Sequence, residues 1–372
     1  MRSAVTALLA CAVLLGAAAP ASAAGRDPVG WASAQDGSLL GEQDYAPGYD
    51  LARYMSCFGA DGAVWSDPRY DYCKQRRQLR QTGSGKEKAQ IQLTVPSNTT
   101  LVGVGGDERL LGVFLTVNTG TNIIVRDLRL EAPVDHFTSW SPDDGTRGSW
   151  NARFGAMTVI TGKHVRVDQC TFTDGRFPDR DAPLGFHGEH VQRHDGLVDI
   201  EDGSDFITVS DSRFTDHDKA ILVGSGDGRG DRDRGHLKVT FVRNLFSDIV
   251  QRGPRVRFGQ VPVVNNVYRG RNTLYALGVG VESAIFSERN VFRYPGGGPS
   301  LAVAAHGGEH FRDTGSWVNG RPAGLDAVAS DLGLTGDVGW HPADVCTYRT
   351  PTSSSAVERY VLRHAGAGRP HA

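Results

Sequence analysis

From residue 98 onward the chain repeats a short pattern in which β-branched and apolar residues alternate with polar ones. Each copy closes on a large apolar or aromatic residue. Alternation with a period of two is typical of a strand that buries one of its faces. The copies lie at 123–130, 165–172, 206–214, 239–246, 261–268 and 283–292, and they close on Leu130, Phe172, Phe214, Phe246, Tyr268 and Phe292.

The spacing of these closing residues predicts how the strands are arranged. They follow one another after 42, 42, 32, 22 and 24 positions. Short strands that repeat every 20–25 residues or so are typical of a parallel β-solenoid. An antiparallel sandwich is disfavoured because two-residue hairpin signals are scarce. We therefore predict an all-β, single-stranded right-handed parallel β-helix, in which loop insertions form a groove on one face. Asn265, Asn266 and Asn290 fall at predicted corners, where their amides can stack.

The first residues have the pattern of a targeting signal. Arg2, an apolar run over 4–19 and the small residues at 21–23 are typical of a secretory signal peptide over 1–23. No other apolar run approaches the ~20 residues of a membrane span. We expect a secreted, extracellular protein with one β-helix domain over 24–372. Within it, 24–95 is rich in loops, with a charged helix over 66–80 and a Gly/Ser break at 83–85.

The composition and the cysteine count limit the class of protein to which the chain can belong. The net charge of −2 excludes nucleic-acid binding through bulk charge. The 47 glycines against 17 prolines favour a protein rich in turns. Four cysteines follow the signal peptide: Cys57, Cys73, Cys170 and Cys346. Export permits disulfides, and Cys57 with Cys73 would close a short loop, but the sequence leaves the pairing open. We expect Cys170 to be a buried free thiol.

The candidate chemistry centres on residues 251–259, which hold three arginines in a short segment. In an extended segment Arg255 and Arg257 project to the same side, and guanidinium groups clamp carboxylates. A solvated basic edge strand is the plain alternative. Upstream lie two aspartates four positions apart, Asp195 and Asp199, and a lysine, Lys219. Together these residues form a candidate site. Within it, we expect Arg255 to have a structural role, in which it pairs with an acidic side chain and so links two coils.

Several motifs resemble the pectate lyases of the first polysaccharide lyase family, and the resemblance covers about 95–368. The motifs lie at 121–126, 140–151, 195–199, 216–219, 250–259, 264–268 and 365–368. The resemblance implies a β-elimination on polygalacturonate or pectin, in which a base removes the C5 proton and the C4 oxygen leaves. The C5 proton is acidic only when the uronate charge is neutralised, which Ca²⁺ and cationic side chains can do.

The resemblance also implies a role for each matching residue. Asp195 and Asp199 match calcium ligands, and Arg252 matches the base. Lys219 and Arg257 match substrate-binding residues, and Asp144 matches an acidic position near the groove. A guanidinium ordinarily stays charged, so the role of base requires surrounding cations that favour its neutral form.

The sequence departs from the family pattern at three positions. Gly155 stands where the family has a calcium-binding aspartate, and Gln169 and Pro262 stand where it has histidines. Two carboxylates instead of three predict weak calcium binding, which Gly155→Asp would tighten. The departures keep two alternatives open: a pectin lyase that acts on methyl-esterified chains without calcium, and a weakly active carbohydrate-binding β-helix.

Other polar residues have plainer interpretations. His187, His190 and His194, with Glu189, have the spacing of a loop more than of a metal site. His217 is expected to stack between coils. Asp227, Asp231 and Asp233 are expected to lie in a solvated, mobile loop. We expect a monomer whose partner is polygalacturonate or pectin, with no nucleic acid and no membrane.

Overall fold

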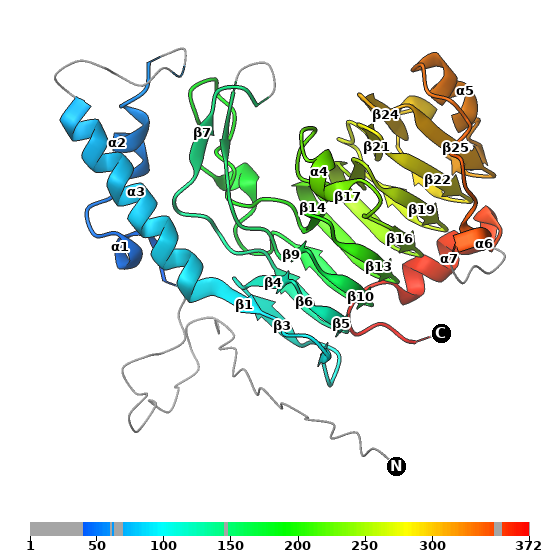
Figure 1. Cartoon of the computed structure of the whole chain (residues 1–372), viewed down its shortest axis with the longest axis horizontal. Helices are drawn as coiled ribbons and strands as arrows, with labels where there is room; N and C mark the ends of the chain where they lie inside the picture. Colours follow the sequence, from blue (N-terminus) through cyan, green and yellow to red (C-terminus); the bar gives the residue numbers. More distant parts are fainter. Residues whose placement is uncertain (1–39, 60–61, 63–69, 145–147, 346–351, 372) are drawn as a thin grey trace. The chain divides into compact units, whose positions relative to one another are not determined.

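Successive strands of the chain stack on one another in long parallel sheets (Figure 1). The computed structural model describes residues 40–59, 62, 70–144, 148–345 and 352–371, and those from Glu42 onward belong to one compact unit. The first sheet holds β1 (Gln92–Thr94), β4 (Phe114–Asn118), β9 (Met157–Ile160), β12 (Val198–Glu201), β15 (Ile221–Val223), β18 (Arg255–Val256), β21 (Leu277–Gly280) and β24 (Val303–His306).

Two further sheets complete each coil, and the predicted parallel β-helix is confirmed. The second sheet holds β2 (Thr99–Val102), β5 (Thr121–Arg126), β10 (Lys163–Asp168), β13 (Asp205–Ser210), β16 (Val239–Val242), β19 (Gln260–Val264), β22 (Ala284–Glu288) and β25 (His310–Thr314). The third sheet holds β3 (Arg109–Leu111), β6 (Arg129–Glu131), β11 (Thr171–Thr173), β14 (Arg213–Lys219), β17 (Leu245–Gln251), β20 (Val267–Arg269), β23 (Val291–Arg293), β26 (Trp317–Val318) and β27 (Arg321–Pro322). Only the β26–β27 pair in these sheets is antiparallel among the described strands.

The closing residues of the sequence repeat form one column in the third sheet. Leu130 pairs with Phe172, and the register continues through Phe214, Phe246, Tyr268 and Phe292. Neighbouring rings stack with centroids 4.7–5.1 Å apart. This distance is close to the ~4.8 Å separation of paired strands, so each coil places its ring directly on the next.

A ladder of buried amides runs along one corner of the coils. The side chain of Asn244 donates to Asn266 Oδ1 at 3.0 Å, and the side chain of Asn266 donates to Asn290 Oδ1 at 3.1 Å. The same oxygens accept the backbone N–H of the preceding asparagine, at 2.9 and 2.8 Å. The predicted stacking at Asn266 and Asn290 is confirmed, and Asn244 extends it.

We expect Asn266→Ala to lower the free energy of unfolding by about 3 kcal/mol or more, because several buried donors and acceptors lose their partner at once. Those groups include the Phe241 carbonyl oxygen, which accepts from the Asn266 side chain at 3.0 Å. Urea denaturation measures the change. Asn118→Ala is the control, because this side chain is exposed. Equal stability of the two variants would contradict the role of the ladder.

A second core lies outside the coils, around α1 (Glu42–Tyr45), α2 (Leu51–Met55) and α3 (Tyr70–Ile91). Its buried members are Tyr45, Ala46, Tyr49, Tyr54, Phe137, Trp150 and Val191. Trp150 belongs to a hairpin of β7 (Ser139–Ser141) and β8 (Ser149–Asn151). The predicted break at 83–85 is wrong, since α3 continues through it. A Cβ at Gly83 would lie 2.3 Å from Phe137 Cε1, so this glycine lets the helix approach the ring.

The cysteine predictions have three outcomes. A disulfide joins Cys57 to Cys73. Cys170 is a buried free thiol, as predicted. Cys346 lies outside the described residues, as does the predicted signal peptide.

The remaining helices are short or lie at the end of the chain. They are η1 (Asp179–Asp181), α4 (Gly230–Asp233), η2 (Pro299–Leu301), α5 (Leu325–Asp331), α6 (Pro342–Val345) and α7 (Ser354–His364). In α7, Val357 and Val361 pack on Leu245, Val267 and Val291 of the third sheet. None of the helices in the described part of the chain has both the length and the apolar character needed to cross a membrane.

Candidate active site

The candidate residues gather where the third sheet passes into the first. Asp199 of β12 is in register with Leu222 of β15, and Leu222 with Arg255 of β18. Residues in one register column share a face of the sheet, so Asp199 and Arg255 belong to the same face. Two coils separate them, which corresponds to roughly 10 Å along the stack.

Asp195 and Asp199 concentrate negative charge at this face. Asp199 is 9% exposed, whereas the side chain of Asp195 is 37% exposed. Burial raises the pKa of Asp199 well above its ordinary value, and the carboxylates of Asp195 and Glu201 raise it further. Arg252 and Lys219 act in the opposite direction, so both lie close enough to influence the carboxylate. The two carboxylates could hold a cation between them.

Lys219 is a buried lysine that points toward this charge. It is the last residue of β14 and is 7% exposed. Its Nζ donates to Gln192 Oε1 at 2.6 Å and lies 3.9 Å from Asp195 Oδ1. The alternative that Lys219 merely pairs with Asp216 or Asp218 has no support among the described ion pairs.

Arg252 follows β17 directly and is held by backbone bonds to both neighbouring coils. Its φ of 62° is left-handed, a conformation that residues with a Cβ rarely adopt. Its carbonyl accepts from Ile221 N at 2.8 Å, and the next amide, of Gly253, donates to Ala276 O at 2.7 Å. The buried Nε of Arg252 has no hydrogen-bond partner. The backbone therefore fixes the position of the Arg252 Cα, and the Arg252 side chain forms a hydrogen bond with the Tyr275 hydroxyl.

The other two arginines differ from each other. Arg257 forms an ion pair with Asp227, and its Nη1 donates to Gly224 O at 3.0 Å. Arg255 pairs with no carboxylate among the described residues, so the predicted bridge to an acidic side chain is wrong. Burial lowers the pKa of Arg255, and the positive charge of Arg257 lowers it further. The arginines thus form a cationic row only partly neutralised by protein carboxylates.

The loop predicted to be mobile around residues 227–233 is partly fixed. Asp233 is fully buried, and its Oδ1 accepts from Gly203 N at 2.9 Å. Asp227, although exposed, is the ion-pair partner of Arg257. Through Asp227, this loop therefore fixes the position of the Arg257 side chain in the candidate site.

Two further sequence candidates stand apart from the cluster. Asp144 is exposed, and its Oδ2 accepts from the Asn151 side chain at 2.9 Å. No described hydrogen bond or ion pair joins Asp144 to the other candidates, so its role stays a prediction. At Gly155 a Cβ would lie 2.0 Å from the Gly196 carbonyl oxygen. This position is closed by backbone, so it offers no room for a third carboxylate.

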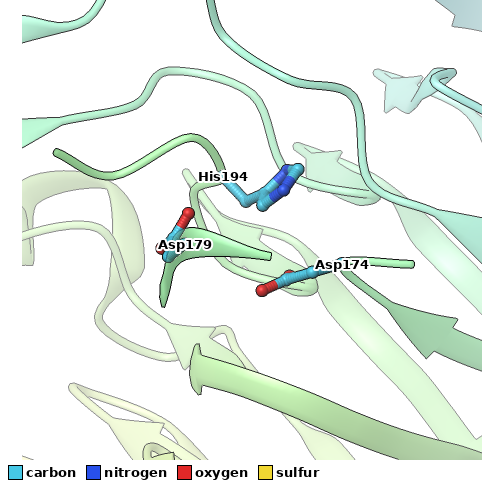
Figure 2. A group of neighbouring side chains, drawn as sticks. All are labelled: Asp174, Asp179 and His194. Atoms are coloured by element: carbon cyan, nitrogen blue, oxygen red, sulfur yellow. The ribbon is translucent and has the colours of Figure 1, made fainter. Parts of the chain in front are cut away.

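A second acidic cluster lies nearby, formed by Asp174, Asp179 and His194 (Figure 2). The Nδ1 of His194 lies 2.9 Å from Pro133 O, and its Nε2 lies 2.8 Å from Phe177 O. Carbonyl oxygens only accept, so both ring nitrogens donate and neither has a lone pair for a metal. The geometry fits a buried structural histidine beside two carboxylates.

His217 belongs to the same buried network. Its Nδ1 lies 2.6 Å from Asp174 Oδ1, just after β11 on the neighbouring coil, so His217 contacts that coil through a hydrogen bond. Burial lowers the pKa of His217, but the charge of Asp174 and its hydrogen bond outweigh that effect and raise it overall. His190 contacts the Ala182 carbonyl oxygen at 2.7 Å. These histidines brace the loops beside the site, and the loop interpretation of the histidine-rich segment is confirmed.

Sequence reasoning missed four residues at this face: Gln192, Glu201, Tyr275 and His306. Glu201 is two positions after Asp199 on β12, and the alternation of β-strands could have identified it. Gln192 lies in a long loop, and Tyr275 and His306 lie on later coils. No local signal points to these three.

The chain is similar to known pectate lyases in sequence and in structure. The sequence model of the family described as "Pectate lyase" matches residues 77–370. A pectate lyase of Bacillus subtilis (strain 168) is 35% identical over 338 residues, which cover 89% of this chain and 77% of that protein. The structure of a thermostable pectate lyase matches with a TM-score of 0.81 at 34% identity, covering 91% of this chain and 83% of that one. A pectate lyase bound to a hexasaccharide matches with a TM-score of 0.81 at 32% identity and the same two coverages.

Proposed function

This chain belongs to the pectate lyase family, and we propose that it cleaves polygalacturonate by calcium-assisted β-elimination with Arg252 as the base. The observation that carries this proposal is the grouping of Arg252 and Lys219 around the buried Asp199 carboxylate. The pectate lyase bound to a hexasaccharide, which shares the fold, supports an oligosaccharide substrate.

The residues divide the reaction between them. Lys219 and Arg257 bind uronate carboxylates and hold the sugar so that its C5 hydrogen faces Arg252. Arg252 accepts the C5 proton, the electron pair of the C–H bond forms the C4–C5 double bond, and the C4–O bond breaks. The leaving oxygen takes a proton from water, and the hydroxide that remains takes the proton from Arg252, which restores the base. Developing charge next to the carboxylate is stabilised by the surrounding cations.

The carboxylates of Asp195 and Asp199 suit calcium both in the type of ligand atom and in their surroundings. Ca²⁺ takes oxygen ligands, and Asp195 and Asp199 would hold it. Burial of Asp199 beside two other carboxylates favours its protonated form, which a bound dication would reverse. When bound, calcium would neutralise a substrate carboxylate and so acidify the adjacent C5 proton.

We also propose that the protein is exported and acts outside the cell as a monomer. The Cys57–Cys73 disulfide supports an oxidising compartment. The signal peptide predicted over 1–23 is consistent with it.

Product analysis tests the proposed reaction. Polygalacturonate at alkaline pH should yield unsaturated, ultraviolet-absorbing oligogalacturonides, and a chelator should abolish the signal. Saturated products would contradict a lyase reaction. Activity on methyl-esterified pectin that withstands the chelator would favour the pectin lyase alternative, which the closed position at Gly155 keeps open. No product from either polymer would favour a carbohydrate-binding β-helix.

Calcium and substrate should bind cooperatively. Two protein carboxylates make a weak site, and substrate carboxylates supply the missing oxygen ligands. We expect oligogalacturonate to tighten calcium binding about tenfold or more. Calorimetric titration of calcium into the Arg252→Lys protein, with and without the oligosaccharide, measures this without turnover. Tight binding to the free protein would show that another residue completes the site, with Asp144 the first candidate.

A further inference from the structure

The two partners of the ion pair between Arg257 and Asp227 differ in their exposure to solvent. The side chain of Arg257 is 11% exposed, whereas that of Asp227 is 59% exposed. Asp227 Oδ1 accepts from Arg257 Nε, and Asp227 makes no other side-chain hydrogen bond or ion pair with the described residues. An exposed carboxylate is solvated and screened, so such a pair contributes little to stability. Another carboxylate can therefore replace Asp227 at low cost.

Asp227 belongs to a loop that is anchored at both ends and open in the middle. At its start, Gly224 N donates to a carbonyl oxygen of β12 at 2.9 Å, and at its end Asp233 anchors α4. Between these anchors, Gly226 and Gly228 flank Asp227. A Cβ at Gly228 would meet nothing within 4 Å. Residues without a Cβ change their backbone torsions with little steric hindrance, so the loop can move Asp227 while its ends stay in place.

Arg257 has further contacts that remain when Asp227 moves away. Its backbone N–H donates to Val223 O at 2.8 Å, and its Nη1 donates to Gly224 O at 3.0 Å. A Cβ at Gly280 would lie 3.0 Å from Arg257 Cγ, so the arginine lies in space that another side chain would otherwise fill. Removal of the Asp227 charge therefore leaves Arg257 at the site with an unpaired positive charge.

The proposed reaction needs the guanidinium that Asp227 occupies. Arg257 is assigned to a uronate carboxylate of the substrate, yet Asp227 already neutralises its charge. Two carboxylates that approach one guanidinium repel each other. The charge of Asp227 also reaches the neighbouring arginine, because burial lowers the pKa of Arg255 and Asp227 acts in the opposite direction. Asp227 is therefore placed as a counter-ion to the arginines that the substrate must reach.

We propose that Asp227 is a displaceable counter-ion, which occupies Arg257 in the free protein and competes with the uronate carboxylate of the substrate for it. The inference rests on the proposed function and deepens it, because it adds a residue that sets the affinity for an ionised substrate. When the substrate binds, Arg257 exchanges one carboxylate for another and Asp227 moves into solvent. The competition weakens the binding of a polyanion, and it favours release of the oligogalacturonate product.

Calorimetry with hexagalacturonate tests this competition, in the Arg252→Lys background and with calcium present. Asp227→Asn keeps the shape of the side chain and removes its charge. We expect it to tighten binding about 2- to 5-fold at low ionic strength, the range that loss of one exposed ion pair allows. The gain should shrink at ~1 M salt, where charges are screened over about 3 Å. Asp227→Glu keeps a carboxylate and should bind like the parent protein.

Two further variants isolate the contact with Arg257. Asp231→Asn removes the same charge from an exposed aspartate of α4 in the same loop, so it should leave the affinity unchanged. In an Arg257→Gln background, Asp227→Asn should no longer tighten binding, because the guanidinium for which the carboxylates compete is absent.

Several outcomes would overturn the proposal. Weaker binding by Asp227→Asn would mean that Asp227 positions Arg257 for the substrate, and unchanged binding would mean that the two carboxylates do not compete. An equal gain in Asp231→Asn, or a gain that survives the loss of Arg257, would reduce the effect to overall charge. If hexagalacturonate does not bind the parent protein and polygalacturonate yields no unsaturated product, the proposed function itself fails, which is a different result from normal binding that ignores Asp227.

Discussion

Arg252→Lys should reduce the turnover number on polygalacturonate by about three orders of magnitude, the middle of the range for a positioned proton acceptor. Lysine keeps the positive charge but lacks the planar fork of donors. Because the backbone fixes the Cα of residue 252, the lysine Nζ also lies at a different position from the guanidinium nitrogens. Both residues have a Cβ, so the left-handed φ of 62° costs them about the same and folding stability should not change. Initial rates of ultraviolet-absorbing product and the melting temperature measure the two effects.

Two comparisons separate chemistry from binding. The variant should bind oligogalacturonate nearly as well as the natural protein, so that kcat falls and KM does not. Arg312→Lys, on the exposed side of β25, is the control and should retain full activity. If Arg252→Lys kept more than about a tenth of the rate, a role confined to electrostatic stabilisation would replace the role of base.

The repeating core could be predicted from sequence because its signal is local and periodic. Alternation identified the strands, and the residues closing each copy proved to be one register column, from Leu130 to Phe292. The asparagine corner was only partly predicted. Asn244 lies 22 positions before Asn266 and belongs to the ladder. It stands two positions before its closing residue Phe246, as Asn266 does before Tyr268, so the repeat could have identified it.

The N-terminal helices were harder to predict, because tertiary contacts decide them. Glycine disfavours a helix, which suggested a break at 83–85. In the structure Gly83 is the point at which α3 meets Phe137, so packing outweighs the intrinsic cost. A contact between residues 54 positions apart leaves no periodic trace in the sequence.

The site was predicted where residues follow one another in a motif and missed where loops bring them together. Asp195 and Lys219 were named, but Gln192, which accepts from Lys219, lies in a long insertion. Tyr275 and His306 approach Arg255 only because successive coils stack. The arginine motif suggested that Arg255 bridges to an acidic side chain, yet Arg257 has a carboxylate partner and Arg255 has none among the described residues. Pairing of this kind depends on loop paths, which the local pattern does not specify.

Gly155→Asp should destabilise the protein by about 3 kcal/mol, the upper range for overpacking a closed site, and should not restore tight calcium binding. The sequence alone suggested the opposite, since the family carries an aspartate here. In this chain a Cβ at residue 155 would lie 2.0 Å from the Gly196 carbonyl oxygen and 3.1 Å from its carbonyl carbon. Both are backbone atoms of the segment that leads to Asp199, so relief of the clash displaces the carboxylate that calcium needs.

Matched glycine variants isolate the cause. Gly155→Ala adds the Cβ without the charge and should be destabilised almost as much as Gly155→Asp. Gly298→Asp adds the same side chain where backbone is extended and nothing lies within 4 Å, so its stability should stay near that of the natural protein. Urea denaturation and calcium calorimetry on the three variants decide the matter. A Gly155→Asp protein that is fully stable and binds calcium tightly without substrate would show that the 195–199 segment can move aside. In that case the single substitution Gly155→Asp would restore the third carboxylate, because the close approach of Gly196 would not prevent an aspartate at this position.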